Sequence, residues 1–180
     1  MIERAAAGDV LARPVVALGV VLVTLVAEAM LAARNERRLI ARGAVEPAGD
    51  VHAWMRVAYP LGFAACIAEG WWRGTAWTPT AAAGLTLFAA GKVVKYLAIA
   101  TLGERWTFRV LPLRGQPLVT RGVYRWLRHP NYVGVVGEVL GIALWMQAPM
   151  AGTLFALGFG WLLRQRIRVE EQALEAATAR

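Results

Sequence analysis

Apolar residues occur in long runs that are separated by short polar or arginine-rich segments. Residues 14–33, 53–70 and 80–102 form three such runs, each near the length of about 20 residues that crosses a bilayer as a helix. Two shorter apolar runs, 132–147 and 150–163, are joined by Ala148 and Pro149 and predict a tight helical hairpin. Residues 164–180 are polar and predict a terminal helix. The pattern predicts an all-α integral membrane helical bundle of about five transmembrane helices with a C-terminal cytoplasmic helix.

Arginine is distributed unevenly over the loops of this bundle. If the N-terminus lies outside, the segments that face the cytoplasm hold fourteen arginines and the outer segments hold three. Cytoplasmic loops of membrane proteins carry an excess of positive residues. We therefore expect a multi-pass protein of a bacterial inner membrane, with its functional face toward the cytoplasm. The fourteen are Arg34, Arg37, Arg38, Arg42, Arg105, Arg109, Arg114, Arg121, Arg125, Arg128, Arg164, Arg166, Arg168 and Arg180.

Tryptophans sit near both predicted membrane boundaries, as expected of aromatic belts. Trp71, Trp72 and Trp77 would form the outer belt, and Trp54, Trp106 and Trp126 the inner one.

Composition narrows the function classes. The formal net charge of +8 fits either nucleic acid or an anionic membrane surface, and the hydrophobic runs favour the membrane, so no nucleic-acid partner is expected. The single cysteine, Cys66, excludes an internal disulfide and a thiolate metal cluster. Two histidines, His52 and His129, leave little for a metal site.

Five charged residues fall within or near the apolar runs: Glu28, Glu69, Lys92, Lys95 and Glu138. Such residues are costly in lipid and usually face a protein interior or water. We expect the lysines to snorkel or pair near the inner boundary, and Glu28 to pair with Arg34 or Arg37. Glu138 lies deep in the predicted hairpin, and its role is open between structure and function.

The most polar cluster of the chain precedes the hairpin, in RGQPLVTRGVYRWLRHPNYVG, residues 114–134. Pro130 biases His129 away from helical geometry, which predicts a helix start at this point. Asn131 and the exposed amides of that helix start can bind a polar or anionic group. His129 and Tyr132 add a titratable ring and an aromatic face.

A second cluster, RIRVEEQAL, follows the hairpin. Arg166 and Glu170 are four residues apart, and Arg168 and Glu171 are three apart, so each pair shares one helix face. Taken singly, such pairs are usually surface ion pairs that contribute little to stability. Together with the first cluster, at the same membrane face, they predict a site for a polar cofactor and a lipid. The chain has no G-x-G-x-x-G motif after a strand, so no Rossmann fold is expected.

The run PLVTRGVYRWLRHPNYVG, the apolar hairpin and the later R-x-x-x-E-E closely resemble the isoprenylcysteine carboxyl methyltransferase family. The resemblance covers roughly residues 95–174. It implies a membrane methyltransferase that uses S-adenosyl-L-methionine without a metal. It also implies a division into N-terminal transmembrane helices, residues 1–94, and a catalytic region, residues 95–180.

The resemblance also implies roles for individual residues. Arg166 would position the reacting oxygen of the substrate, and Glu170 would complete the cofactor site and take part in catalysis. Family members often have histidine at the position of Gln116, and glutamine can still form hydrogen bonds. The implied cofactor contacts are Arg109, Gln116, Pro117, Leu118, Val119, Tyr124, His129, Pro130, Asn131, Tyr132, Glu170 and Glu171.

The leading hypothesis is methyl transfer to an oxygen, of a carboxylate or of a phenol or enol, on a lipophilic small-molecule acceptor drawn from the membrane lipid phase. Three alternatives stay open: N-methylation of a phospholipid or amine, a nicotinamide-dependent membrane reductase, and a lipid-binding scaffold without turnover. The sequence leaves the acceptor and the oligomeric state open. Small residues such as Gly84, Gly91 and Gly158 can mediate helix contacts.

Overall fold

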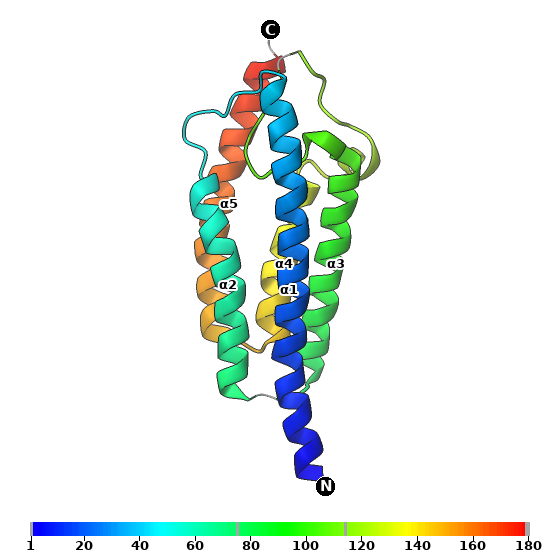
Figure 1. The fold of residues 1–180 in the computed structure, drawn as a ribbon, viewed down its shortest axis with the longest axis vertical. Coiled ribbons are helices and arrows are strands. Elements are labelled where there is room, and N and C mark those ends of the chain that lie inside the picture. The colour runs from blue at the N-terminus through cyan, green and yellow to red at the C-terminus, as the bar shows by residue number, and fades with distance from the viewer. Residues whose placement is uncertain (1, 75, 114, 179–180) are drawn as a thin grey trace.

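The computed structural model describes residues 2–74, 76–113 and 115–178, with the helical path alone for residues 2–11. Its described residues form five long α-helices and no strand (Figure 1). The all-α class is thus confirmed. The elements are α1 (Ile2–Ala41), α2 (His52–Arg73), α3 (Pro79–Leu102), η1 (Gly103–Arg105), η2 (Gly122–Arg125), α4 (Pro130–Trp145) and α5 (Pro149–Thr178).

Local sequence signals set the helix boundaries. Helix α3 begins after Thr78, whose hydroxyl accepts a hydrogen bond from the amide of Ala81, a standard N-cap arrangement. Helix α2 ends at Gly74, which takes a left-handed conformation with φ of 55°. Helix α4 begins at Pro130, directly after a non-helical His129. The helix start predicted at this histidine is therefore confirmed.

Helices α4 and α5 form the predicted hairpin. Helix α5, however, runs without a break from Pro149 to Thr178, so residues 164–178 continue the second hairpin helix instead of forming a separate terminal helix. The described segment after Leu163 contains no glycine or proline to interrupt it. Arg180 lies outside the described residues, as does Arg114.

Helices α3 and α4 pack with their backbones nearly in contact. A Cβ atom on Gly84 would lie 2.2 Å from the backbone nitrogen of Trp145, and one on Gly91 would lie 2.7 Å from the carbonyl oxygen of Gly134. Small residues permit such an approach. Gly84 and Gly91 therefore mediate helix contact within the chain. A Cβ on Gly158 would meet no described atom within 4 Å.

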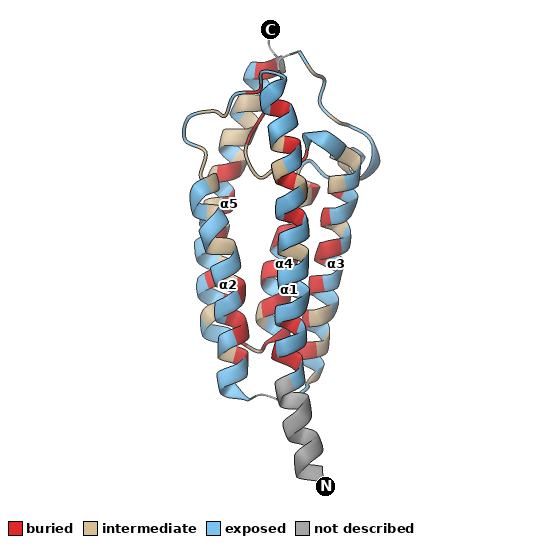
Figure 2. Ribbon diagram, viewed as in Figure 1, coloured by how far each residue is buried: buried red, intermediate tan, exposed pale blue. Residues whose placement is uncertain are grey.

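The outer faces of the bundle are apolar and exposed, while the buried residues face inward (Figure 2). Two helical stretches, Ala12–Ala41 and Pro79–Arg105, are long and apolar enough to cross a membrane. Exposed apolar surface of this extent is typical of a lipid-facing surface. A bundle of five spans with its N-terminus outside stays a prediction.

Four charged residues meet inside the bundle. Lys92 Nζ lies 2.8 Å from Glu28 Oε1 and 2.8 Å from Glu138 Oε2. Lys95 Nζ lies 2.6 Å from Glu28 Oε2 and 3.4 Å from Glu138 Oε1. The expected pairing of Glu28 with Arg34 or Arg37 is wrong, because both carboxylate oxygens of Glu28 face the lysines of α3. We call these four residues the charge network.

Tyr59 connects the charge network to the aromatic core. Its hydroxyl donates a 2.7 Å hydrogen bond to Glu138 Oε2. Its ring packs against Phe63 and Phe159 at centroid distances of 4.7 Å and 5.0 Å. Helix α2 is thereby attached to the charges of α1, α3 and α4.

Candidate active site

The C-terminal ends of α1, α3 and α5 lie at the same end of the bundle (Figure 1), which we call the arginine-rich end because α1, α5 and the segment after α3 carry most arginines of the chain. A cavity of about 360 Å³ lies there, enclosed by the segments that follow α3 and by the last turns of α5. Twelve of the thirteen residues predicted from the sequence line it: Arg109, Gln116, Pro117, Leu118, Val119, Tyr124, His129, Asn131, Tyr132, Arg166, Glu170 and Glu171. The thirteenth, Pro130, is buried at the start of α4. The structure thus brings the predicted residues together, and their roles stay predictions.

Arg166 is buried at the cavity wall, with 5% of its surface exposed. Its Nη1 lies 2.5 Å from each carboxylate oxygen of Asp50. Its Nε donates a 3.2 Å hydrogen bond to the hydroxyl of Tyr132. The guanidinium is therefore held at two of its three nitrogens.

Tyr132 stands between Arg166 and Glu170. Its hydroxyl accepts from Arg166 and donates a short hydrogen bond to Glu170 Oε2. Arg166 and Glu170 share one helix face as predicted, but the phenol of α4 mediates their contact. We call Asp50, Arg166, Tyr132 and Glu170 the site network.

The spacing placed Arg168 and Glu171 on one helix face, but the two side chains bind other partners. Arg168 donates to Gln165 instead. Glu171 Oε1 lies 3.0 Å from His129 Nε2 and 3.3 Å from Arg128 Nε. The hydrogen bond with His129, together with the charge of Arg128, lowers the pKa of Glu171. The pairing joins α5 to the loop before α4 and closes one side of the cavity.

Aromatic rings form another part of the wall. The rings of His129 and Tyr132 stack with a centroid distance of 5.7 Å. Burial raises the pKa of Tyr124, and the charge of Glu170 raises it further, so this phenol stays neutral. Trp106 was predicted to lie in the inner aromatic belt, and this is wrong. It is 3% exposed, and its indole Nε1 donates a 3.0 Å hydrogen bond to Asn131 Oδ1.

Arg109 lines the cavity, but Glu46 binds much of its guanidinium. Glu46 Oε2 accepts from both Nε and Nη2 of Arg109. This interaction raises the pKa of Arg109. Glu36 Oε1 accepts from the backbone amides of Phe108 and Arg109, each at 3.2 Å. The segment after α3 is therefore fixed to α1 and to the loop that follows it.

Asp50 is the site residue that the sequence reasoning missed. It lies in the loop between α1 and α2, and 116 positions separate it from Arg166. Its carboxylate also accepts 3.0 Å hydrogen bonds from the amides of Val110 and His52. Burial alone would raise the pKa of Asp50, but the bonds and charge of Arg166 and the two amides hold it below its usual value. The only local signal was an aspartate in a turn-like segment, which does not indicate so distant a partner.

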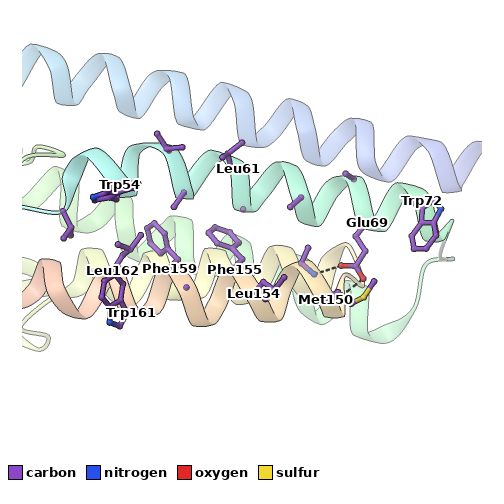
Figure 3. Close-up of a pocket in the computed structure, with 18 residues that line it drawn as sticks. Trp54, Leu61, Glu69, Trp72, Met150, Leu154, Phe155, Phe159, Trp161 and Leu162 are labelled. Atoms are coloured by element: carbon purple, nitrogen blue, oxygen red, sulfur yellow. Dashed lines mark hydrogen bonds between the residues drawn. The ribbon is translucent and has the colours of Figure 1, made fainter.

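A second cavity, of about 1260 Å³, opens between α2 and α5 (Figure 3). We call it the α2–α5 groove. Its lining is almost entirely apolar and includes Trp54, Leu61, Phe155, Phe159 and Leu162. Figure 3 shows Phe155, Phe159 and Leu162 between the two helices, with Glu69 at the far end.

The two ends of the α2–α5 groove differ. At the far end, the Glu69 carboxylate accepts from the backbone amides of Met150 and Ala151 and so caps α5. The near end begins at Val51, the residue that follows Asp50. The groove therefore runs from the first turns of α5 to the neighbourhood of the site network.

Comparisons with known proteins assign the chain to a family. The model of the isoprenylcysteine carboxyl methyltransferase (ICMT) family matches residues 84–176. That stretch includes most of α3, all of α4, most of α5 and every predicted site residue. The chain therefore belongs to the ICMT family.

Individual relatives differ in how much of this chain they match. The uncharacterized protein YpbQ of Bacillus subtilis (strain 168) is 31% identical over 88% of this chain and 94% of its own length. The protein-S-isoprenylcysteine O-methyltransferase of Rattus norvegicus is 34% identical over 52% of this chain, which corresponds to 34% of the rat protein. The enzyme of that name from Tribolium castaneum is 32% identical over 51% of this chain and 33% of its own length. No solved structure gives a significant match.

Proposed function

We propose that this protein is a membrane-embedded methyltransferase that moves the methyl group of S-adenosyl-L-methionine to an oxygen of a lipophilic acceptor. One observation carries the proposal. In a chain of the ICMT family, the cavity lined by Arg166, Glu170 and His129 lies beside the apolar α2–α5 groove. A polar cofactor and an apolar acceptor can therefore meet at one point.

The donors around the cavity suit this cofactor. S-adenosyl-L-methionine combines a sulfonium cation and an amino acid end with an adenosine. The carboxylates of Glu170 and Glu171 offer acceptors for cationic and hydroxyl groups. Leu118 and Val119 add apolar surface, and Tyr124 adds an aromatic face. The volume of about 360 Å³ lies within the usual range for small-molecule pockets. When bound, this cofactor supplies an electrophilic methyl group.

Arg166 would bind the reacting oxygen of the acceptor. Its Nη1 and Nε are occupied by Asp50 and Tyr132, and its Nη2 donates no hydrogen bond to any residue that the structure describes. A guanidinium fixed in this way can present a charge-assisted donor to an anionic oxygen. Fixed orientation of the reactants is the main contribution an enzyme makes to such a displacement.

The site also contains a group that can accept the proton released by the methyl acceptor. A carboxylate acceptor is already ionised at neutral pH and needs no base. A phenol or enol must lose its proton when its oxygen is methylated. Glu170, bound to the hydroxyl of Tyr132, is the carboxylate that would receive that proton through the tyrosine.

The α2–α5 groove would hold the hydrocarbon part of the acceptor. Its lining residues, among them Leu61 and Phe155, offer apolar surface along the length of both helices. The groove is open at the side of the bundle that would face lipid (Figure 3). An acceptor could thus enter from the bilayer while the cofactor enters from the aqueous end.

The test is a methyl-transfer assay with the full chain reconstituted in lipid and methyl-labelled S-adenosyl-L-methionine. Prenylcysteines, long-chain phenols and long-chain pyrones serve as acceptors, and the lipid fraction is analysed for labelled product. We expect one acceptor class to be labelled, and Arg166→Ala to abolish the labelling. Absence of transfer to every class, in protein that remains folded, would contradict the proposal.

A further inference from the structure

We propose that Asp50 is a positioning residue that sets the orientation of the Arg166 guanidinium for methyl transfer. The inference rests on the proposed function, and deepens it by assigning a role to a residue outside the stretch that the family model matches, residues 84–176. Asp50 contributes no atom to the reaction itself. It acts through Arg166.

The geometry of the pair is that of a clamp. Both oxygens of Asp50 lie 2.5 Å from the same nitrogen, Nη1 of Arg166, while Tyr132 binds Nε at 3.2 Å. A planar guanidinium that is bound at two nitrogens cannot rotate about its long side chain. Its third nitrogen, Nη2, therefore keeps one direction, and Arg166 lines the cavity.

Asp50 is itself held in place. The amide of Val110 binds one of its oxygens and the amide of His52 binds the other, each at 3.0 Å. These donors come from the segment after α3 and from the start of α2. With Arg166 of α5, they fix the carboxylate relative to three parts of the chain. A side chain with this support can transmit the position of the α1–α2 loop to α5.

Burial distinguishes this pair from the surface ion pairs of the same protein. The side chains of Arg166 and Asp50 are 6% and 2% exposed, whereas those of Arg38 and Glu104 are 45% and 52% exposed. A buried ion pair is weak evidence for added stability, because desolvation offsets most of its attraction. Its placement at the cavity wall indicates that orientation is its main contribution.

Asp50 also lies between the two cavities. Val51, the next residue, lines the α2–α5 groove, and Arg166 lines the cofactor cavity. The clamp therefore stands where the two proposed ligands would meet. A small displacement of Arg166 there would misalign the acceptor oxygen, and a misplacement of about 1 Å can cost on the order of 100-fold in rate.

The experiment compares Asp50→Asn with wild type in the reconstituted full chain. Asparagine keeps the shape and one acceptor oxygen but lacks the charge that fixes Nη1. We expect kcat to fall about 10- to 100-fold, while the dissociation constant for S-adenosylhomocysteine changes less than about threefold. Asp50→Glu should recover part of kcat. Glu104→Gln, which removes a half-exposed ion pair, is the matched control and should leave kcat unchanged.

Two results would overturn the inference. One is an unchanged kcat in folded Asp50→Asn. The other is a loss of S-adenosylhomocysteine affinity in parallel with activity, which would place Asp50 in the cofactor site or in the fold alone.

A second readout is independent of turnover. The Nη1–H resonances of Arg166, which belong to the nitrogen that Asp50 binds, are assigned with Arg166→Lys; they should be separate and protected from exchange in wild type and should be lost in Asp50→Asn. If wild type methylates no acceptor, the proposed function fails, and these resonances still decide whether Asp50 holds the guanidinium. Unprotected resonances in wild type would refute the clamp.

Discussion

Two buried polar networks lie in this helical bundle, and they differ in what surrounds them. The charge network places Glu28 and Glu138 around Lys92 and Lys95, between α1, α3 and α4. The site network links Asp50, Arg166, Tyr132 and Glu170 at the arginine-rich end. Both are largely removed from water, and both contain side chains that are costly to bury.

The charge network is closed. Each lysine contacts both glutamates, and the four formal charges sum to zero. Among the described residues, none of these four lines the cavity at the arginine-rich end or the α2–α5 groove. Three residues of the site network, in contrast, line the cavity at the arginine-rich end. The contrast teaches that charge within an apolar helix is not enough to indicate a site, and that access to a cavity distinguishes the two cases.

The largest effect is expected from breaking the charge network. Glu28→Ala removes one carboxylate partner from each lysine, and the two lysines are then left with Glu138 as their one carboxylate partner in the network. Removing one partner of a buried pair costs about 3–5 kcal/mol. We expect the variant to accumulate poorly and to unfold at a much lower denaturant concentration, measured by circular dichroism in detergent. Unfolding at the wild-type midpoint would show that the network does not hold the bundle together.

Changing the site network should affect activity more than folding. Arg166→Lys keeps the charge but loses the planar fork that Asp50 and Tyr132 hold. We expect methyl transfer to fall on the order of 100-fold, with a smaller change in melting temperature than in Glu28→Ala. Kinetic assays and thermal unfolding of the same preparation check this. Equal damage to stability in both variants would remove the distinction between the networks.

The contact of α3 with α4 offers a comparison that involves no charge. A Cβ on Gly91 would lie 2.7 Å from the carbonyl oxygen of Gly134 and 2.9 Å from the amide nitrogen of Glu138, and neither backbone atom can move alone. Gly91→Ala should cost about 1–3 kcal/mol in unfolding free energy. Gly19→Ala is the control, because a Cβ there meets no described atom within 4 Å. Equal midpoints for the two variants would refute this account of the packing.

The smallest effect is expected in the stability of the protein at acid pH. The pKa of Asp50 in the folded protein lies below its usual value of about 4. The stabilisation from its ion pair is therefore fully present above that usual value and is lost as pH falls through the lower, folded pKa. We expect Asp50→Asn to lack this component of acid destabilisation, measured as melting temperature between pH 6 and about pH 3. A wild-type acid slope in the variant would contradict the shift.

Much of the site was predictable because its signals are local. Pro130 after His129 marks a helix start, and the spacing of Arg166, Glu170 and Glu171 places them on adjoining helix faces. The all-α bundle and its final hairpin follow from the apolar runs. These features require only neighbouring residues and a known family pattern.

Other features depend on pairings between distant segments. Asp50 meets Arg166 across 116 positions, and Glu28 meets Lys95 across 67. Trp106 is buried, and Asn131 accepts the hydrogen bond of its indole, although its position near a membrane boundary suggested a belt. The packing of the helices determines which distant residues become partners, and no local sequence pattern specifies that packing.

The most direct test of the central claim is calorimetric titration of the purified full chain with S-adenosyl-L-methionine, S-adenosylhomocysteine and NADPH. It is repeated on His129→Ala, which removes the ring that stacks on Tyr132 and contacts Glu171. The account predicts that both S-adenosyl compounds bind at one site per chain, that His129→Ala weakens them about tenfold or more, and that NADPH does not bind. Binding of NADPH alone, or of none of the three to folded protein, would contradict it.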